Sequence, residues 1–231
     1  ALKGEMASKC RLAEESILIE RDVLKETVGC QDQVIAAHGG FNHIVFERTG
    51  NILVNPVTVH PEKLADLNNH LLLFYTGIQR SSSEVASTYA NTLNSKDQQM
   101  HEIHGMVNEG ISILAGNSSI EDFGKLLDHG WQSKRSISPS VSNHKIDSIY
   151  ENAIQAGAVG GKLLGAGGGG FILICAAPNN HGRIKERLKQ LTHVPFKFDS
   201  TGTQIILFEP EEDYSGEDKV RANRISTSRD S

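Results

Sequence analysis

Cysteine is scarce in this sequence, in which Cys10, Cys30 and Cys175 are the three thiols among 231 residues. An odd number of widely separated cysteines does not indicate a disulfide framework. The ten histidines are scattered, and none lies four residues from another on a predicted helix, so their spacing predicts no zinc site. We therefore expect a reducing, cytoplasmic setting.

Long apolar runs and an excess of positive charge are also absent. No apolar run approaches the roughly 18 residues that a membrane-spanning helix needs. The net charge of -5 argues against nucleic-acid binding, because such proteins use a basic face to displace the counterions of phosphates. Apolar residues make up 38% of the chain and aromatic residues 6%. This composition predicts a soluble protein with one substantial core or two small ones, and with neither nucleic-acid nor membrane partners.

Hydrophobic periodicity predicts a mixed architecture. Helices are expected over residues 9–26, 81–93, 97–115, 119–134, 142–157 and 180–191. Strands are expected over residues 43–47, 51–54, 71–75, 171–177, 195–198 and 203–208. This order favours an α+β fold in which helices cover an antiparallel sheet. The acidic segment after residue 208 has few apolar residues, which predicts a disordered tail.

Two carboxylates stand out in the first 40 residues. Glu20 interrupts the apolar arc of the first predicted helix, where it requires either a buried salt bridge or a functional role. Asp32 follows a glycine turn and begins a helix of small residues, so an ordinary N-cap is one explanation for it. Two acids on adjoining elements also suit phosphoryl transfer, in which one holds Mg²⁺ and the other orients or deprotonates the attacking hydroxyl.

A glycine-rich segment follows residue 160 and includes Gly165, Gly167, Gly168, Gly169 and Gly170. Its spacing satisfies the G-x-G-x-x-G fingerprint, but that fingerprint must open a helix, and an apolar strand-like run follows here instead. We therefore reject a dinucleotide-binding fold. Two readings stay open: a linker or core turn, or a tight turn whose amides face an anion. Lys162 would supply a cation beside such an anion site.

Two further segments carry groups that suit an anionic or hydroxylated ligand. Thr76, Gly77 and Arg80 follow the predicted strand 71–75, at the end where loops commonly bind ligands. A helix cap is the alternative reading of this loop. Lys134 and Arg135 end a predicted helix, where the helix dipole favours cations in any case.

These segments together resemble the GHMP kinase superfamily of galactokinase, homoserine kinase, mevalonate kinase and phosphomevalonate kinase. Gly29-Cys-Gln-Asp-Gln33 resembles the segment with the catalytic aspartate, and Glu20 matches the position of the magnesium-binding glutamate. The segment 162–170 resembles the third, glycine-rich motif. The similarity extends from residue 1 to about residue 208 and is strongest to D-glycero-D-manno-heptose 7-phosphate kinases; fucokinase-type domains are the competing subgroup.

The resemblance implies a fold, a reaction and a set of roles. Residues 1–80 would be the C-terminal part of an S5-like α/β domain, residues 81–208 a ferredoxin-like C-terminal domain, and residues 209–231 the tail. The reaction would phosphorylate the anomeric hydroxyl of heptose 7-phosphate with ATP and Mg²⁺. Asp32 would be catalytic and Glu20 would bind the metal, with the glycines of the turn near the phosphates. The sugar phosphate would be bound by Thr76, Gly77, Arg80, Lys134, Arg135 and Lys162.

One family motif is missing, namely the Pro-x-x-x-Gly-Leu-Gly-Ser-Ser loop that wraps the ATP phosphates. The opening Ala-Leu-Lys-Gly4 is typical of the last turn of a helix with its C-cap glycine, which predicts a parent enzyme with further N-terminal residues. Removal of an initiator methionine is the alternative reading. The missing loop also leaves open a non-catalytic sugar-binding module derived from a kinase, and exposed strand edges would favour a homodimer.

Overall fold

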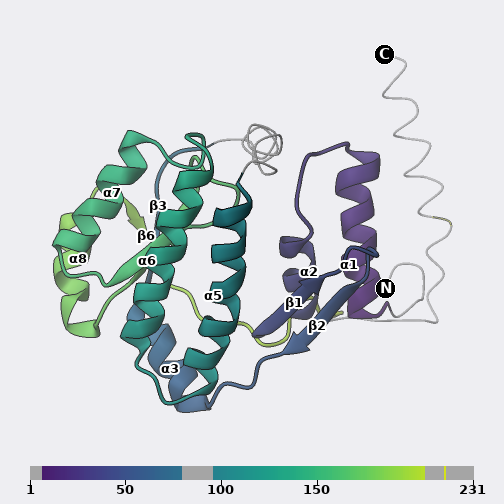
Figure 1. Ribbon diagram of the computed structural model, residues 1–231, viewed down its shortest axis with the longest axis horizontal. Helices are drawn as coiled ribbons and strands as arrows, with labels where there is room; N and C mark the ends of the chain where they lie inside the picture. The colour runs from purple at the N-terminus through teal and green to yellow at the C-terminus, as the bar shows by residue number, and fades with distance from the viewer. Residues whose placement is uncertain (1–6, 80–95, 206–215, 217–231) are drawn as a thin grey trace.

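The computed structural model describes residues 7–79, 96–205 and 216, which form two lobes (Figure 1). In the first lobe two helices lie beside a hairpin whose strands pair antiparallel. Its elements are α1 (Lys9–Leu18), the π-helical turn η1 (Ile19–Val23), α2 (Gln31–His38), β1 (Asn42–Phe46) and β2 (Ile52–Pro56). Buried Ala13, Val34 and Ala37 form its small core, because short side chains let α1 and α2 approach closely.

The second lobe contains a four-stranded antiparallel sheet with the order β4-β5-β3-β6. Its strands are β3 (Leu71–Tyr75), β4 (Gly160–Leu163), β5 (Phe171–Cys175) and β6 (Thr192–His193). Its helices are α3 (Pro61–His70), α5 (Asp97–Ala115), α6 (Ile120–Ile137), α7 (His144–Gln155), the 3₁₀ turn η3 (Pro178–Asn180) and α8 (His181–Arg187). The predicted α+β architecture is confirmed.

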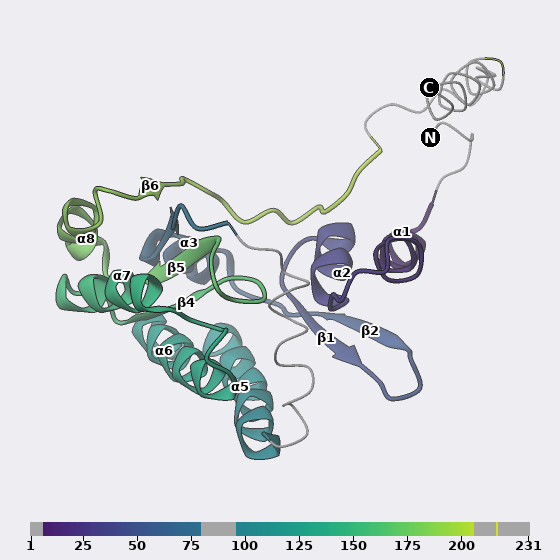
Figure 2. The same ribbon diagram turned by 90° about the horizontal axis from the view of Figure 1, so that it is seen from above.

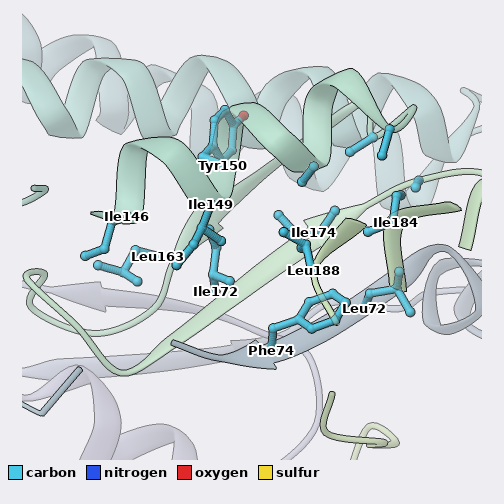
Figure 3. Close-up of a cluster of buried hydrophobic side chains, with 14 of the residues drawn as sticks. Leu72, Phe74, Ile146, Ile149, Tyr150, Leu163, Ile172, Ile174, Ile184 and Leu188 are labelled. Carbon is cyan, nitrogen blue, oxygen red and sulfur yellow. The ribbon is translucent and has the colours of Figure 1, made fainter. Parts of the chain in front are cut away.

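The sheet is buried on both faces. On one face, Phe74 and Leu72 pair with Ile172 and Ile174 of β5 and pack beneath Ile149 of α7 (Figure 3). The other face packs against α3, α5 and α6 through a second cluster of Leu67, Leu71, Leu114, Ile120 and Cys175. Burial on both faces explains why residues 71–75 form a continuous apolar run instead of alternating with polar residues.

Residues 194–205 lead back from the second lobe to the first (Figure 2). Phe198 packs edge-on against Phe41 with ring centroids 4.8 Å apart, and Phe196 packs against Phe198. Single backbone hydrogen bonds then join Gly40 N to Asp199 O and Thr203 N to Ala36 O. This segment therefore fastens the two lobes together through ring packing and isolated hydrogen bonds.

Several boundaries differ from the sequence predictions. The predicted strand 195–198 is wrong, because its aromatic side chains pack at the junction of the lobes and its backbone joins no ladder. Residues 203–205 are not a strand either, whereas 206–208 and the predicted helix 81–93 lie outside the described residues. The predicted domain boundary at residue 80 leaves β3 apart from β5, with which it pairs; the two sheets divide between β2 and β3.

The elements that escaped prediction include α3, β4 and the short strand β6. A side chain at Gly160 of β4 would overlap the carbonyl oxygen of Gly124 in α6, so glycine allows this helix to lie directly on the strand. Glycine is otherwise depleted in strands, which hid β4 in the sequence. Within the described part of the chain, no helix is both long enough and apolar enough to cross a bilayer.

Candidate active site

A cleft of about 590 Å³ lies between the lobes. Its first wall comes from η1 and the start of α2, and its second wall from α6, β4 and the glycine turn. The groups that carry its chemistry are Glu20, Glu26, Asp32, Lys134, Lys162 and Gly165. Acids on one wall therefore face cations on the other, although the two sets lie far apart in the sequence.

Glu20 lies in the π-helical turn η1, where the backbone widens so that Leu24 N donates to Ile19 O. Such turns are frequent at functional sites, because the extra residue changes the direction of the side chains. The carboxylate is half-buried, and its Oε2 accepts a hydrogen bond of 2.5 Å from Gln33 Nε2. Among the described residues no cation forms a salt bridge with Glu20, so Gln33 takes the place of the buried salt bridge considered above.

The apolar arc predicted around Glu20 is only partly buried. Leu12 and Ile17 pack against the small core of the first lobe. Ile19, Val23 and Leu24 are instead 49%, 65% and 59% exposed. Ile19 and Val23 belong to the π-helical turn and Leu24 follows it, so the phase of the regular helix does not continue through them, and regular helical periodicity cannot predict this change.

Asp32 is the second residue of α2 and is exposed to the cleft. Cys30 occupies the N-cap position, so the reading of Asp32 as an N-cap is wrong. A carboxylate in the first turn is nevertheless favoured by the helix dipole. The loop before α2 is held by Arg21, whose guanidinium donates two hydrogen bonds to Val28 O. The position of Asp32 therefore depends on η1 as well as on α2.

Two half-buried lysines form the opposite wall. Lys134 comes from the last turn of α6, and its Nζ donates to Gly165 O at 2.6 Å. Burial lowers the pKa of Lys134 to about 8, helped by the charge of Lys162 and opposed by that of Asp32. Burial also lowers the pKa of Lys162, which lies in the middle of β4. Two neighbouring cations in a desolvated place are stabilised by an anionic ligand.

The glycine turn between β4 and β5 is held by hydrogen bonds within the protein. Gly168 N donates to Val141 O and Gly170 N donates to Ile78 O. These two amides are therefore occupied, which corrects the expectation that they face a phosphate. Gly165, by contrast, lines the cleft and is exposed. The first part of the turn, at Gly165, therefore lines the cleft, whereas the part from Gly168 to Gly170 is hydrogen-bonded to neighbouring segments.

Glycine is required at Gly167 and Gly169 because other backbone lies against them. A Cβ at Gly167 would lie 2.8 Å from Val141 O, and this residue also has a φ of +124°. A Cβ at Gly169 would lie 2.5 Å from Ile78 O. This part of the turn is packed against its neighbours, which excludes the flexible-linker reading.

Three predicted substrate-binding residues lie away from the cleft lining. The Thr76 side chain is buried, and its hydroxyl donates to Gly170 O at 2.8 Å, so it fixes the glycine turn. Gly77 is exposed beside it with a φ of +71°. Arg135 pairs with Asp147 at 2.9 Å and lies over the Trp131 ring. Arg80 lies outside the described residues.

Gln33 is a site residue that the sequence did not single out for itself. It is 9% exposed and lines the cleft, and its Nε2 holds Glu20 in place. Its Oε1 is buried, with no hydrogen-bond partner in the described part of the chain. The one sequence signal that could have identified Gln33 as a site residue was its place directly after Asp32, because a glutamine at the start of a helix forms no distinctive pattern.

The cleft fits a magnesium ion of the kind that accompanies a nucleotide. The described residues contain no group of three or more His, Cys, Asp or Glu that would bind a metal by themselves. Magnesium at phosphoryl-transfer sites is commonly held by one or two carboxylates together with phosphates and water. The Glu20 carboxylate, fixed by Gln33 and open to the cleft, is a suitable protein ligand of this kind.

Comparison with known proteins agrees with this arrangement. Residues 112–192 match the family described as GHMP kinases C terminal. The chain is also 31% identical over 191 residues to the D-glycero-alpha-D-manno-heptose 7-phosphate kinase of Campylobacter jejuni, in an alignment that covers 80% of the chain and 56% of that kinase. Residues 112–192 are thus similar to the C-terminal domain of GHMP kinases. Lys134, Lys162 and the glycine turn lie inside this segment, whereas Glu20 and Asp32 precede it.

Two other similarities extend the comparison. A bifunctional fucokinase/GDP-fucose pyrophosphorylase of Arabidopsis thaliana is 25% identical over 181 residues, which are 75% of the chain and 17% of that protein. A crystal structure of a D-glycero-D-manno-heptose 1-phosphate kinase from Bacteroides thetaiotaomicron superposes with a TM-score of 0.65 at 23% identity, over 88% of the chain and 57% of that structure. The latter supports the GHMP kinase fold. The chain thus spans a little over half of the heptose kinases that it matches.

Proposed function

We propose that the protein is a sugar kinase that transfers the γ-phosphoryl group of ATP to the anomeric hydroxyl of a sugar phosphate. The observation that carries this proposal is the cleft in which Glu20 and Asp32 face Lys134 and Lys162. Phosphoryl transfer needs little covalent chemistry from the protein, and is promoted by positioning and by charges that match the phosphates. Both requirements are met by an acidic wall opposite a basic one.

Each wall has its own part in the proposed reaction. Asp32 orients the attacking hydroxyl and accepts its proton as the bond to the γ-phosphorus forms and the bond to the leaving ADP breaks. Glu20, fixed by Gln33, holds Mg²⁺, which when bound neutralises charge on the nucleotide phosphates. Lys134 and Lys162 bind the phosphate oxygens of the substrates.

The proposed substrate is heptose 7-phosphate, which would yield heptose 1,7-bisphosphate. The similarity to a heptose 7-phosphate kinase supports this choice. The relative named as a fucokinase favours an unphosphorylated sugar as the second candidate. Two half-buried lysines in one cleft favour the phosphorylated sugar, because a neutral sugar would leave part of their charge uncompensated.

An assay with both sugars tests the function. The protein is incubated with ATP, Mg²⁺ and either heptose 7-phosphate or fucose, and the products are identified by phosphorus NMR. We expect a new anomeric phosphate with heptose 7-phosphate. Turnover of fucose alone would establish the second candidate. Calorimetric titration with ATP-Mg²⁺ and with each sugar separately completes the test, since binding of a sugar without binding of ATP would indicate a non-catalytic module.

Phosphate affinity is expected to depend on pH through Lys134. Its pKa of about 8 means that the ammonium group loses its proton as the pH rises through this value. The affinity for a sugar phosphate should therefore fall by about tenfold between pH 7 and pH 9 at constant ionic strength. Calorimetry across this range measures the effect, and Lys134→Met should flatten the profile. An unchanged slope in this variant would exclude Lys134 from the phosphate site.

A further inference from the structure

A second cavity of about 360 Å³ adjoins the cleft. It lies between α5 and α6, which run side by side in both views of the molecule (Figures 1 and 2), and Phe41 and Val57 of the first lobe close it. Its walls are mostly apolar. The polar residues in them are Asn42, Lys134 and Lys162, and the two lysines line the cleft as well. The proposed kinase reaction makes no use of this space.

Trp131 forms part of the apolar wall of the cavity. Trp131 is 1% exposed and lines the cavity, and its indole Nε1 has no hydrogen-bond partner among the residues that the structure describes. A buried donor without an acceptor is costly, and native proteins usually satisfy such a group. Because Nε1 itself is shielded, Trp131 contributes its apolar ring to the cavity wall, and the polar contacts of a ligand must come from the edge of the cavity.

Two glycines within the helices keep the cavity open. Gly110 of α5 and Gly130 of α6 both line it, although glycine inside a helix is unfavourable compared with alanine. A Cβ at Gly110 would lie in ordinary contact with Leu126, 3.5 Å away, and one at Gly130 would lie 3.5 Å from Met106. Alanine would therefore fit at both positions, and larger side chains would take up the space.

From these observations we infer that the cavity binds the apolar part of an amphiphilic anion, such as an alkyl or aryl phosphate, whose phosphate is held by Lys134 and Lys162. The volume of the cavity lies within the range of small-molecule sites. The apolar walls provide most of the contact, and the two cations fix the orientation. Because both lysines also line the cleft, a bound amphiphile competes with phosphates there and inhibits the proposed kinase.

The tryptophan fluorescence of the protein provides a direct test. Trp131 is the single tryptophan of the chain, so in the folded protein all tryptophan emission comes from a residue in the wall of this cavity. Titration with hexyl phosphate should give a saturable change in emission, confirmed by calorimetry. Affinity should rise about fourfold for each methylene added from propyl to hexyl phosphate. Hexanol and inorganic phosphate should each bind at least about tenfold more weakly than hexyl phosphate. Hexanol lacks the phosphate that the lysines bind, and inorganic phosphate lacks the alkyl chain that the apolar walls contact.

Two variants of α5 make the test specific. Gly110→Leu fills the cavity and should weaken hexyl phosphate binding at least about tenfold, while inorganic phosphate binds as before. Gly105→Leu is the matched control, because Gly105 is exposed on the same helix and a Cβ there would contact nothing within 4 Å. Circular dichroism verifies the fold of both. If Gly110→Leu is unfolded, the inference is tested by the dependence of affinity on alkyl chain length, from propyl to hexyl phosphate, in the unchanged protein.

The inference would be overturned by no saturable response to hexyl phosphate, by affinity independent of chain length, or by equal binding of hexyl phosphate and hexanol. A folded Gly110→Leu variant with unchanged affinity would overturn it as well. None of these measurements requires ATP or turnover. The cavity can therefore fail this test while the kinase proposal stands, and the kinase assay can fail while the cavity binds its ligand.

Discussion

Replacement of Asp32 by asparagine is expected to lower kcat for sugar phosphorylation by a factor of about 10²–10⁴. Asparagine keeps the shape of the side chain but cannot accept the proton of the attacking hydroxyl. Asp32 is exposed to the cleft in the first turn of α2, so the change leaves the hydrophobic clusters untouched. Steady-state kinetics in a preparation that turns over heptose 7-phosphate measure the effect, and KM should change much less than kcat.

The matched control is Asp22→Asn. Asp22 is an exposed carboxylate of η1 and does not line the cleft, so its loss removes the same charge from the same lobe without touching the site. We expect kcat to remain within about twofold of the unchanged protein. Similar losses in the two variants, or near-normal turnover in Asp32→Asn, would contradict the role proposed for Asp32.

Replacement of Phe74 by alanine is expected to reduce the free energy of unfolding by about 3–5 kcal/mol. Phe74 lies in the middle of β3, is 1% exposed and pairs with Ile172, so its loss opens a cavity in the main core. The sheet also carries Thr76 and Gly170, which join β3 to the glycine turn. Urea unfolding followed by the emission of Trp131 measures the change.

Phe171→Ala is the control for Phe74. Phe171 lies on the neighbouring strand β5 and is 40% exposed, where it contacts Tyr75 at a centroid distance of 5.2 Å. Its replacement removes the same number of atoms from a place where water can enter, and we expect a loss of about 1 kcal/mol. If the two variants lost equal free energy of unfolding, the buried packing around Phe74 would not be the main source of the stability that this sheet provides.

The two acids of the cleft were recognisable for different reasons. Glu20 breaks a local rule because it interrupts an amphipathic helix, whereas Asp32 suits a helix start and drew attention through its place after a glycine turn and its nearness in sequence to Glu20. Gln33 breaks no such rule, and its importance depends on the hydrogen bond to Glu20 and on an unpaired oxygen. A sequence pattern does not contain the partner of a polar group unless that partner lies on the same element.

For the cations and for Thr76, residue type predicted more substrate-binding residues than the structure places in the lining of the cleft. Arg135 and Lys134 are neighbours on α6, yet Arg135 pairs with Asp147 while Lys134 reaches Gly165. Successive residues of a helix point about 100° apart, so Lys134 faces the cleft while Arg135, in the same turn, forms a structural ion pair. Thr76 has the right chemistry for a sugar, but its hydroxyl is taken up by the glycine turn.

The sequence by itself determined the hairpin, most of the helices, the buried strands β3 and β5 and the similarity to GHMP kinases. These features follow from short-range periodicity, turn residues and local motifs, which act over a few neighbouring residues. Only the tertiary structure decided which charges share a cleft, that β4 runs beside α6, and that a glycine-lined cavity opens next to Lys134 and Lys162. Such features depend on the packing of residues far apart in the chain, because burial and hydrogen-bond partners are properties of the assembled core.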